Sequence, residues 1–393
     1  MRRDPLEYLS SELQALRDQG LYRTLRVLDG EQKARTSIDR RVVVNLSSNN
    51  YLGLTTHPRL RDRAIEATRR LGVGSGSVRT IAGTMEIHME LERKLAAFKR
   101  TEAAVVFQSG FTANAGTVSS ILGRNDVIVS DELNHASIID GARLSRATIK
   151  VFPHRDAAAA RRIVQELPAG QRKLIITDGV FSMDGDLGAL PELCDLAGEF
   201  GCIMMVDDAH ASGVFGQQGR GTVDHFKLHG RVDVQVGTLS KAIGALGGYV
   251  AGSRALIEFL YHRARPFLFS TSHPPAVAAT CLAALEVLET EPALMDRLWE
   301  NTRFFKAGLA ALGFDTGASE SPITPVIVGE AARAMALSDR LFEKGVFAQG
   351  IGFPTVPQGK ARVRTIVTAT HTRDELQFAL DCFKAVGAEL GVI

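Results

Sequence analysis

The stretch "GTLSKAIGALGGYVAGS", residues 237–253, holds a single lysine, Lys241, directly after a short apolar run. Its neighbours are glycine, alanine, serine and threonine, and no acidic residue stands beside it. A lysine that only kept a surface soluble would not need neighbours this small. Small residues permit a close approach to the backbone, so we expect something flat to pack against this turn.

The rest of the chain alternates between short apolar runs and helical segments. Continuous apolar strands that alternate with helices predict an α/β fold with a mainly parallel sheet covered on both faces. The pattern changes near residues 289–292, and the helices and strand candidates that follow predict a smaller α+β domain. We therefore expect an N-terminal helix and arm over 1–50, a large domain over 51–289 and a small domain over 290–393. The strand candidates of the large domain are residues 103–110, 126–131, 173–179, 202–208 and 233–238.

The composition is that of an ordinary globular protein. The 393 residues are 45% hydrophobic and 23% charged, with a net charge of +2. Opposite charges are interspersed, which excludes the basic stripe of a nucleic-acid-binding protein. The N-terminal segment is not typical of a secretory signal, and no apolar stretch is long enough to cross a bilayer. The four cysteines, Cys194, Cys202, Cys281 and Cys382, are scattered, so we expect reduced thiols, a cytoplasmic protein and no metal site.

Polar side chains follow each strand candidate. In sheets of this type, ligands bind at the carboxyl ends of the strands. The first strand leads into "SGFTAN", residues 109–114, a turn of small residues whose backbone N–H groups can hold a phosphate at the start of a helix. Together these strand ends predict one site. The side chains that follow the other four strands are His135, Ser182, Asp207 with His210, and Thr238 with Lys241.

Each of these features also has an ordinary structural explanation. The turn at 109–114 serves equally well as a helix cap, His135 as a structural histidine, and Asp207 as the cap of the next helix. Only the meeting of all these features at one edge of the sheet indicates a catalytic site. The glycine-rich residues 72–84 follow a helical pattern and lack the G-x-G-x-x-G spacing of a dinucleotide site. No P-loop, H-E-x-x-H or G-x-S-x-G motif is present, which removes the common NTPase, metalloprotease and hydrolase classes.

The cofactor that fits all five strand ends is pyridoxal 5'-phosphate (PLP). Its aldehyde needs the amine of a lysine for a Schiff base, and that lysine must be near neutral to react. Its pyridine nitrogen needs a carboxylate to hold a proton, so that the ring can accept electrons. Its phenolic oxygen needs hydrogen-bond donors, and its phosphate needs N–H groups and hydroxyls. A flat ring at this site also explains the small residues around Lys241.

Several motifs along the chain carry a resemblance to a known family. They are "SNNYLGL" (48–54), "SVRTIAGT" (77–84), "LNHASIIDG" (133–141), "TDGVFSMDGD" (177–186), "VDDAHASGVFGQQGRG" (206–221), "TLSKA" (238–242), "RPFLFSTSHPP" (265–275) and "ARVRTIVTATHT" (361–372). These motifs resemble the α-oxoamine synthases, PLP enzymes of fold type I that join an amino acid to an acyl-CoA. The resemblance covers nearly the whole chain and implies a seven-stranded, mainly parallel sheet with a smaller C-terminal domain.

The resemblance implies a role for each residue around the cofactor ring. Lys241 would form the Schiff base and later move the α-proton of the amino acid. Asp207 would pair with the pyridine nitrogen, and His135 would stack on the ring. His210 and Ser182 would contact the phenolic oxygen. The catalytic residues would therefore be Lys241, His135, Asp207 and His210.

The resemblance also implies how the phosphate and the substrates bind. Arg364 would pair with the carboxylate of the amino acid through its planar guanidinium. Asn50 and Thr355 would lie near the substrate, and Arg23 would serve the acyl-CoA side. The enzyme would be a homodimer with active sites at the interface. The phosphate would be held by Ser109, Gly110, Phe111 and Thr238 of one subunit and by Ser270 and Thr271 of the other.

Two pairs of nearby residues need to be told apart. Successive side chains of a strand alternate, so only one of Asp207 and Asp208 can face the ring. Arg362 and Arg364 lie on one face of a strand, where both could also be solvated charges at an edge. The resemblance selects Asp207 from the first pair and Arg364 from the second.

The sequence leaves the substrates open. "SVRTIAGT" and the closing "VGAELGVI" resemble family members that use glycine and acetyl-CoA, a reaction of threonine degradation, and we place that pair first. "TSHPPA" and "FPTVPQGKARVR" resemble members that use alanine and a pimeloyl thioester in biotin synthesis. That reaction, or a dual specificity, is the alternative. Serine palmitoyltransfer, ordinary aminotransfer and a PLP-binding protein without catalysis are further alternatives.

Overall fold

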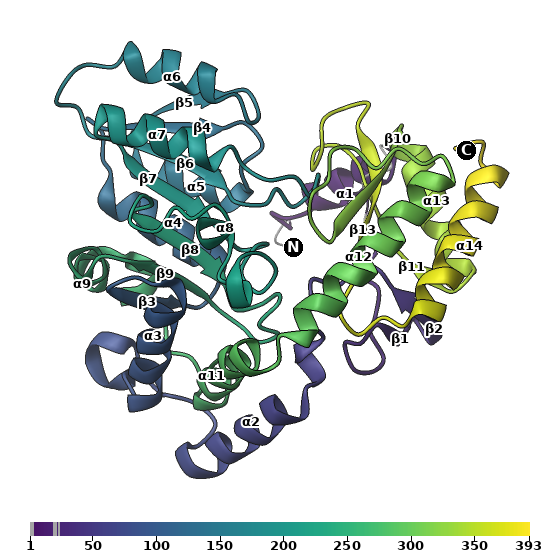
Figure 1. Ribbon diagram of the computed structural model, residues 1–393, viewed down its shortest axis with the longest axis horizontal. Helices are drawn as coiled ribbons and strands as arrows, with labels where there is room; N and C mark the ends of the chain where they lie inside the picture. Colours follow the sequence, from purple (N-terminus) through teal and green to yellow (C-terminus); the bar gives the residue numbers. More distant parts are fainter. Residues whose placement is uncertain (1–3, 19–21, 23) are drawn as a thin grey trace.

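The computed structural model describes residues 4–18, 22 and 24–393. Figure 1 shows a larger lobe that carries the long sheet and a smaller lobe beside it, joined by α12 (Ala293–Ala311). Helix α11 (Pro275–Thr290) precedes α12 and packs against α2 (Pro58–Leu71) at the base of the larger lobe. The helix expected in the N-terminal segment is α1 (Tyr8–Asp18), and none of its residues is buried.

The larger lobe is built on a seven-stranded sheet, which confirms the fold that the resemblance implied. The order of its strands is β3-β9-β8-β7-β6-β4-β5. Strand β9 runs antiparallel to both of its neighbours, and the remaining pairs are parallel. The strands are β3 (Ala103–Phe107), β4 (Val127–Asp131), β5 (Thr148–Phe152), β6 (Lys173–Asp178), β7 (Ile203–Asp207), β8 (Val234–Thr238) and β9 (Gly248–Gly252).

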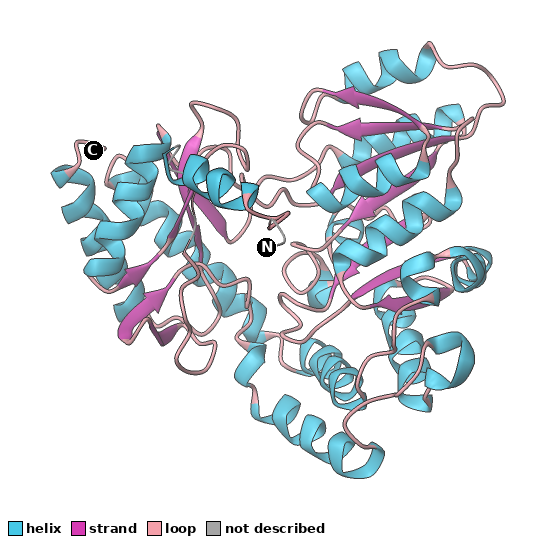
Figure 2. Ribbon diagram, turned by 180° about the vertical axis from the view of Figure 1, so that it is seen from behind, coloured by secondary structure: helices cyan, strands magenta, loops and turns pink. Residues whose placement is uncertain are grey.

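Helices cover both faces of this sheet, as Figure 2 shows from behind. They follow the strands in the expected alternation. Short helical turns, η1 (Leu54–Thr56), η2 (Arg79–Gly83) and η3 (Gln217–Gly219), lie in the connections. The helices of the larger lobe, besides α2 and α11, are α3 (Glu86–Lys99), α4 (Gly110–Ile121), α5 (Ala136–Ser145), α6 (Ala157–Gln165), α7 (Leu190–Phe200), α8 (Thr222–His225), α9 (Arg254–Arg263) and α10 (Arg265–Leu268).

The two faces of the sheet belong to different hydrophobic clusters because side chains alternate along each strand. Met205 of β7 packs with Ile138 of α5 on one face. Its neighbours Met204 and Val206 pack with Leu193 of α7 on the other face. Burial on both faces is the reason that these strands are continuous apolar runs in the sequence.

The smaller lobe contains two three-stranded sheets. One has the order β10-β13-β12, and the other has the order β1-β2-β11. Strand β2 pairs in parallel with β11, so residues 41–45 of the expected N-terminal arm join the C-terminal part of the chain. The elements are β1 (Arg35–Ile38), β2 (Arg41–Asn45), β10 (Ile323–Gly329), β11 (Val346–Phe347), β12 (Gln349–Ile351), β13 (Ala361–Ile366), α13 (Ala331–Glu343) and α14 (Arg373–Glu389). Among the described residues, no helix combines the length and apolar character needed to cross a membrane.

Candidate active site

A cavity opens at the carboxyl ends of β3, β4, β6, β7 and β8. Nine of the residues expected from the sequence line it: Ser109, Gly110, Phe111, His135, Ser182, Asp207, His210, Thr238 and Lys241. Four residues that the sequence analysis did not single out line it as well: Ser137, Asp178, Ala209 and Ser240.

Lys241 lies in the turn between β8 and β9. Its Nζ makes no hydrogen bond to any described residue. Burial lowers the pKa of Lys241 to about 8, against the opposing effect of the carboxylates of Asp207 and Asp178. A lysine with a lowered pKa offers a neutral amine at moderate pH, which is the form that reacts with a carbonyl.

The small residues around Lys241 let two other segments of the chain pack against its turn. A Cβ atom on Gly248 would lie 2.3 Å from the carbonyl oxygen of Ser109. Gly244 has a φ of +74°, and a Cβ atom there would lie 2.8 Å from the backbone nitrogen of Thr55. The sequence analysis explained these residues by a flat ligand alone. The structure adds contacts with the protein's own backbone, which hold the lysine turn against the start of α4.

The side chains of Asp207 and Asp208 point to different surroundings, as the alternation of side chains along a strand requires. The carboxylate of Asp207 lines the cavity and accepts hydrogen bonds from the Nδ2 of Asn114 at 2.6 Å and from the backbone N–H of Ala209 at 2.8 Å. The carboxylate of Asp208 is buried elsewhere and forms an ion pair with Lys99 at 2.9 Å. Only Asp207 is therefore placed to meet a ligand in the cavity.

Asn114 is a site residue that the sequence analysis missed. Its Nδ2 also donates to the Oγ of Ser137 at 2.9 Å, so it links the Asp207 carboxylate to the start of α5. Asn114 lies four residues after Gly110 on α4, and the helical period brings its side chain to the same end of the sheet. That spacing was the available signal.

His135 is held over the cavity from two sides. Its backbone N–H donates to the Oδ2 of Asp178 at 2.8 Å, and its Nδ1 accepts from the backbone N–H of Ser137 at 3.2 Å. Burial lowers the pKa of His135, so the ring is neutral near pH 7. Burial, followed by the neighbouring carboxylate of Asp207, raises the pKa of Asp178 well above its usual range. Two carboxyl groups therefore face Lys241, and the raised pKa of Asp178 favours the protonated form of that residue.

His210 is buried, and its Nδ1 lies 2.8 Å from the hydroxyl of Tyr51. Burial lowers the pKa of His210 well below its ordinary value, and the nearby cations Lys241 and Arg364 lower it further. The ring is therefore neutral, with one nitrogen engaged by Tyr51. Tyr51 belongs to the motif "SNNYLGL", but the sequence analysis did not single it out.

The N-terminus of α4 faces the cavity and can receive an anion. The hydroxyl of Ser109 accepts from the backbone N–H of Thr112 and thereby caps the helix. The backbone N–H groups of Gly110 and Phe111 donate to no other described residue. Free N–H groups at a helix start bind phosphate well. Thr238 lines the same end of the cavity.

Ser270 and Thr271 do not line the cavity of their own chain. Thr271 is exposed, its carbonyl accepts from the Nε2 of Gln108 at 2.8 Å, and it forms an isolated bridge with Val78. The preceding Phe269 is 70% exposed. These hydroxyls therefore lie outside the cavity wall, on a segment that leaves a large apolar side chain uncovered.

The expected substrate residues are placed unequally. Arg364 lies near the cavity, and its Nη1 donates to the carbonyl oxygen of Ser182 at 3.0 Å. Asn50 is buried and donates to the Oγ1 of Thr55 at 2.7 Å. Thr355 lies exposed in the loop before β13. Arg23 lies outside the described residues.

Arg362 is not a solvated charge at an edge. It is 3% exposed, and its Nη1 contacts the carboxylate of Asp184 at 2.5 Å and the carbonyl of Met183 at 3.0 Å. Arg362 and Arg364 therefore reach the same turn from the same face of β13, but only Arg364 lies close enough to Lys241 and His210 to influence their pKa values.

The chain belongs to the class I and II aminotransferase family, whose sequence pattern matches residues 41–383. Within it, the chain is an α-oxoamine synthase. It is 63% identical to an 8-amino-7-oxononanoate synthase of Symbiobacterium thermophilum, over 98% of this chain and 99% of that protein. It is 54% identical to 8-amino-7-oxononanoate synthase 1 of Bacillus subtilis, over 98% and 99%. A variant of serine palmitoyltransferase from S. paucimobilis with a bound PLP–myriocin aldimine has a TM-score of 0.94, 33% identity and full coverage of both chains.

The cofactor of this family is PLP, and the cavity fits it. An amine at Lys241 and N–H groups at Gly110 and Phe111 that have no partner among the described residues match the aldehyde and the phosphate, and the carboxylate of Asp207 matches the ring nitrogen. The Oδ1 of Asn114 is also buried without a hydrogen bond to a described residue. Lys241, Asp207, Gly110 and Phe111 all line the cavity, and Asn114 reaches it through its hydrogen bond to Asp207.

Proposed function

We propose that this enzyme condenses alanine with a pimeloyl thioester to give 8-amino-7-oxononanoate, with release of CO₂ and the free thiol. The observation that carries the proposal is the 63% identity to an enzyme of that name over nearly the full length of both chains. The second of the two substrate pairs derived from the sequence is thus favoured. The comparisons do not support the first pair, glycine with acetyl-CoA, nor a role in threonine degradation.

Serine palmitoyltransfer has weaker support. The solved serine palmitoyltransferase shares the fold and the family at 33% identity. The relatives that share more than half of their residues with this chain carry the other name. Likeness of fold within one family does not select a substrate, because the substrate is chosen by a few side chains on a common scaffold.

Each residue of the cavity has its own role in the proposed reaction. When bound, PLP supplies an electron-withdrawing ring that stabilises negative charge at the Cα of the amino acid. The amine of Lys241 takes the proton from that carbon and later returns one. The carboxylate of Asp207 would keep a proton on the ring nitrogen, and the neutral His210 with Ser182 would donate to the phenolic oxygen. The ring of His135, which lines the cavity, would help to hold the cofactor there.

The amino-acid carboxylate would bind to Arg364. A guanidinium presents five donors, and one of them is used by the carbonyl oxygen of Ser182. Two parallel donors remain for a carboxylate. Asn50 and Thr355 would lie at the substrate side and Arg23 at the acyl side.

We also propose that the enzyme works as a homodimer. The exposed side chains of Ile81 and Phe269, 82% and 70% exposed, lie on segments that the bridge between Val78 and Thr271 brings together. Apolar side chains this exposed favour burial against a second protein surface. In that arrangement the hydroxyls of Ser270 and Thr271 would reach the phosphate site of the other subunit.

A matrix of substrates tests the proposed reaction. Free thiol would be measured with alanine, glycine and serine, each combined with pimeloyl-, acetyl- and palmitoyl-CoA, and the products would be identified by mass spectrometry. We expect the highest kcat/KM for alanine with pimeloyl-CoA. A higher value for glycine with acetyl-CoA, or for serine with palmitoyl-CoA, would replace the proposal with that reaction.

A further inference from the structure

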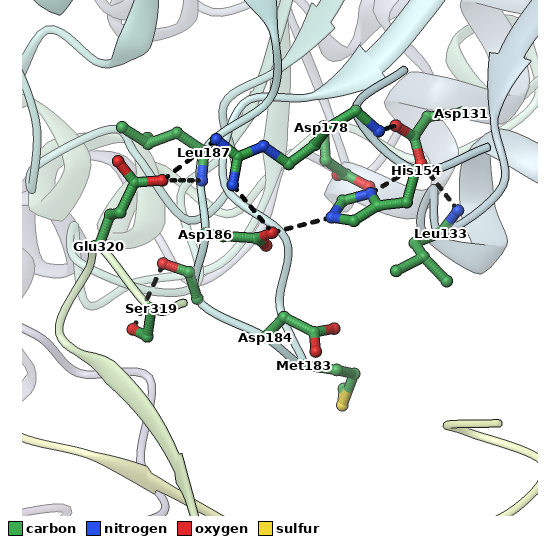
Figure 3. Close-up of polar contacts among 12 residues, drawn as sticks. Asp131, Leu133, His154, Asp178, Met183, Asp184, Asp186, Leu187, Ser319 and Glu320 are labelled. Atoms are coloured by element: carbon green, nitrogen blue, oxygen red, sulfur yellow. Dashed lines mark hydrogen bonds and ion pairs between the residues drawn. The ribbon is translucent and has the colours of Figure 1, made fainter. Parts of the chain in front are cut away.

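A second charged cluster lies beside the cavity, in the loop between β5 and α6. The Nδ1 of His154 lies 3.1 Å from the Oδ1 of Asp131, and its Nε2 lies 2.8 Å from the Oδ2 of Asp186 (Figure 3). An ionised carboxylate only accepts hydrogen bonds. Both ring nitrogens must therefore carry a hydrogen, which makes His154 an imidazolium. None of these three residues lines the cavity.

Asp186 belongs to the turn that carries Ser182. This turn is closed by an isolated bridge between Val180 and Leu187 and by the backbone N–H of Gly185, which donates to the carbonyl of Phe181 at 2.8 Å. The edge of the His154 ring packs against the ring of Phe181 at 4.3 Å between centroids. His154 therefore contacts the turn at both of its ends, near the start at Phe181 and near the end at Asp186.

The smaller lobe holds the same turn through two arginines of β13. Arg364 donates to the carbonyl of Ser182, and Arg362 donates to the carbonyl of Met183 and pairs with Asp184. The position of the Arg364 guanidinium thus depends on where the turn lies. A turn that shifts outward would carry the Ser182 carbonyl away from it.

A further bridge joins the cluster to the smaller lobe directly. Arg155 reaches Asp186 at 3.4 Å with Nη1 and Glu320 at 3.5 Å with Nη2. The backbone N–H of Glu320 donates to the carbonyl of Gly185 at 3.0 Å. Gly185 has a φ of +76°, and a Cβ atom there would lie 2.4 Å from the carbonyl oxygen of Ile323, so the two lobes touch at this glycine.

We propose that His154 is a positioning residue: as an imidazolium between Asp131 and Asp186 it fixes the turn 180–187, and through the Ser182 carbonyl it fixes Arg364 for the carboxylate of the amino acid. The last step of this inference rests on the proposed function, because it takes Arg364 as the carboxylate site. The fixing of the turn does not depend on the identity of either substrate.

The charge of His154 persists over most of the ordinary pH range. Burial lowers its pKa, but the hydrogen bonds with Asp131 and Asp186 outweigh burial and raise the pKa to about 9. The other charged groups that face the cluster are Arg155, with Glu320 behind it, and Glu132, whose carboxylate accepts from the backbone N–H of His154 at 2.8 Å. The carboxyl group of Asp178 is near enough to that of Asp131 to interact with it electrostatically. The Nζ of Lys306 donates to the backbone carbonyls of Ser319 and Ser321. Deprotonation of His154 above pH 9 removes one of its two hydrogen bonds and should loosen the turn.

The test compares H154Q with H229Q in the holoenzyme. His229 is a matched control, because it also pairs with a carboxylate, that of Asp224 at 2.8 Å, but among the described residues neither of the two hydrogen-bonds to the turn 180–187. Hydrogen exchange of peptides that cover 179–188 would be followed from pH 6.5 to 10, corrected for the intrinsic rate. Alanine affinity would be measured from the visible absorption of the bound cofactor, and KM for alanine and kcat from turnover.

We expect H154Q to raise exchange in 179–188 and to weaken alanine binding, each by roughly tenfold, since hydrogen bonds to charged groups are lost. KM should rise more than kcat falls, and the change in exchange that we expect near pH 9 in the wild type should be absent. H229Q should match the wild type. Exchange and affinity unchanged in H154Q, or changed equally in H229Q, would overturn the proposal.

The variant D186N covers the case in which H154Q does not fold. It keeps the shape of the side chain but removes its charge, so the pH midpoint of exchange in the turn should fall below that of the wild type. An unchanged midpoint would overturn the proposal. If the enzyme turned over other substrates but the exchange results held, the proposed function alone would have failed.

Discussion

Asp207 and Asp208 are neighbours in the chain, but the carboxylate of Asp207 lines the cavity while that of Asp208 lies 2.9 Å from the Nζ of Lys99. The side chains of Lys99 and Asp208 are both fully buried. A buried charge is tolerated when it is paired and hydrogen-bonded, and Asp208 also accepts from the backbone N–H of Thr222 at 3.2 Å. One carboxylate is thus committed to the fold, and the other remains available to a ligand.

Substitution of Asp208 should therefore lower the stability of the protein, whereas substitution of Asp207 should lower its activity. D208N leaves the charge of Lys99 unpaired and should lower the free energy of unfolding by about 3–5 kcal/mol. D207N should leave that free energy nearly unchanged and lower kcat by roughly a hundredfold or more, the effect of losing one preorganised electrostatic partner. Urea unfolding and release of free thiol measure the two quantities. Equal losses of stability and activity in both variants would show that the two roles are not divided.

Lys241 should bind the cofactor covalently, and the rate should depend on pH in a particular way. Because the pKa of Lys241 is lowered to about 8, half of the amine should be in its reactive neutral form near pH 8, and this form should level off about one pH unit higher. The rate of covalent PLP binding to the apoenzyme, followed by visible absorption, should show the same plateau. Borohydride reduction and peptide mapping should place the pyridoxyl label on Lys241. A rate that keeps rising to pH 10, or a label on another lysine, would contradict this assignment.

Tyr51 should act through His210. Y51F removes the hydroxyl that contacts the Nδ1 of His210 and leaves that buried nitrogen unpaired, a loss of about 1–3 kcal/mol. The affinity for PLP should fall by roughly tenfold, measured by equilibrium titration of the apoenzyme. Y261F is the matched control, since the hydroxyl of Tyr261 donates to Glu92 outside the cavity. PLP affinity that is unchanged in Y51F, or lowered equally in Y261F, would count against the role of Tyr51.

The sheet and much of the cavity could be predicted from the sequence because both depend on local patterns. Strands buried on both faces are continuous apolar runs, and parallel strands bring their carboxyl ends to one edge. Asp207 and Lys241 stand directly at such ends. Asp178 does too, as the last residue of β6, and the same rule applied to "TDGVFSMDGD" would have found it.

Other features depend on contacts that no local pattern contains. Tyr51 reaches His210 across a separation of 159 residues, and strand β2 pairs with β11 from the far end of the chain. Arg362 is a further example. The alternation of side chains along β13 correctly placed it on the same face as Arg364, but its partner, Asp184, lies in a turn of the other lobe and could not be predicted. Alternation shows which face a side chain takes, whereas the tertiary fold decides what it meets there.

The homodimer can be tested by mixing two inactive variants. K241A lacks the amine, and T271A lacks a hydroxyl that we propose reaches the neighbouring phosphate site. After subunit exchange, mixed dimers contain one site with both defects and one site with neither, so activity should return toward about a quarter of the wild-type value. The arithmetic follows from random exchange, in which half of the dimers are mixed and each has one intact site. T271A that is fully active, or an active monomer in analytical ultracentrifugation, would contradict the shared site.

We expect Arg364 to serve substrate binding and Arg362 to serve the contact between the two lobes. In R364K the planar fork is lost, and a lysine cannot make two parallel hydrogen bonds to a carboxylate. The loss of hydrogen bonds to a charged group, about 1.5–3 kcal/mol, should raise the dissociation constant of alanine by roughly tenfold to hundredfold, with little change for the acyl thioester. R362K is the control: it should mainly lower the free energy of unfolding, since it disturbs the pair between the buried Arg362 and the half-buried Asp184. Alanine binding, followed by the absorption of the bound cofactor, and urea unfolding provide the two readouts. If R364K weakened only the thioester, the guanidinium would belong to the acyl side of the site.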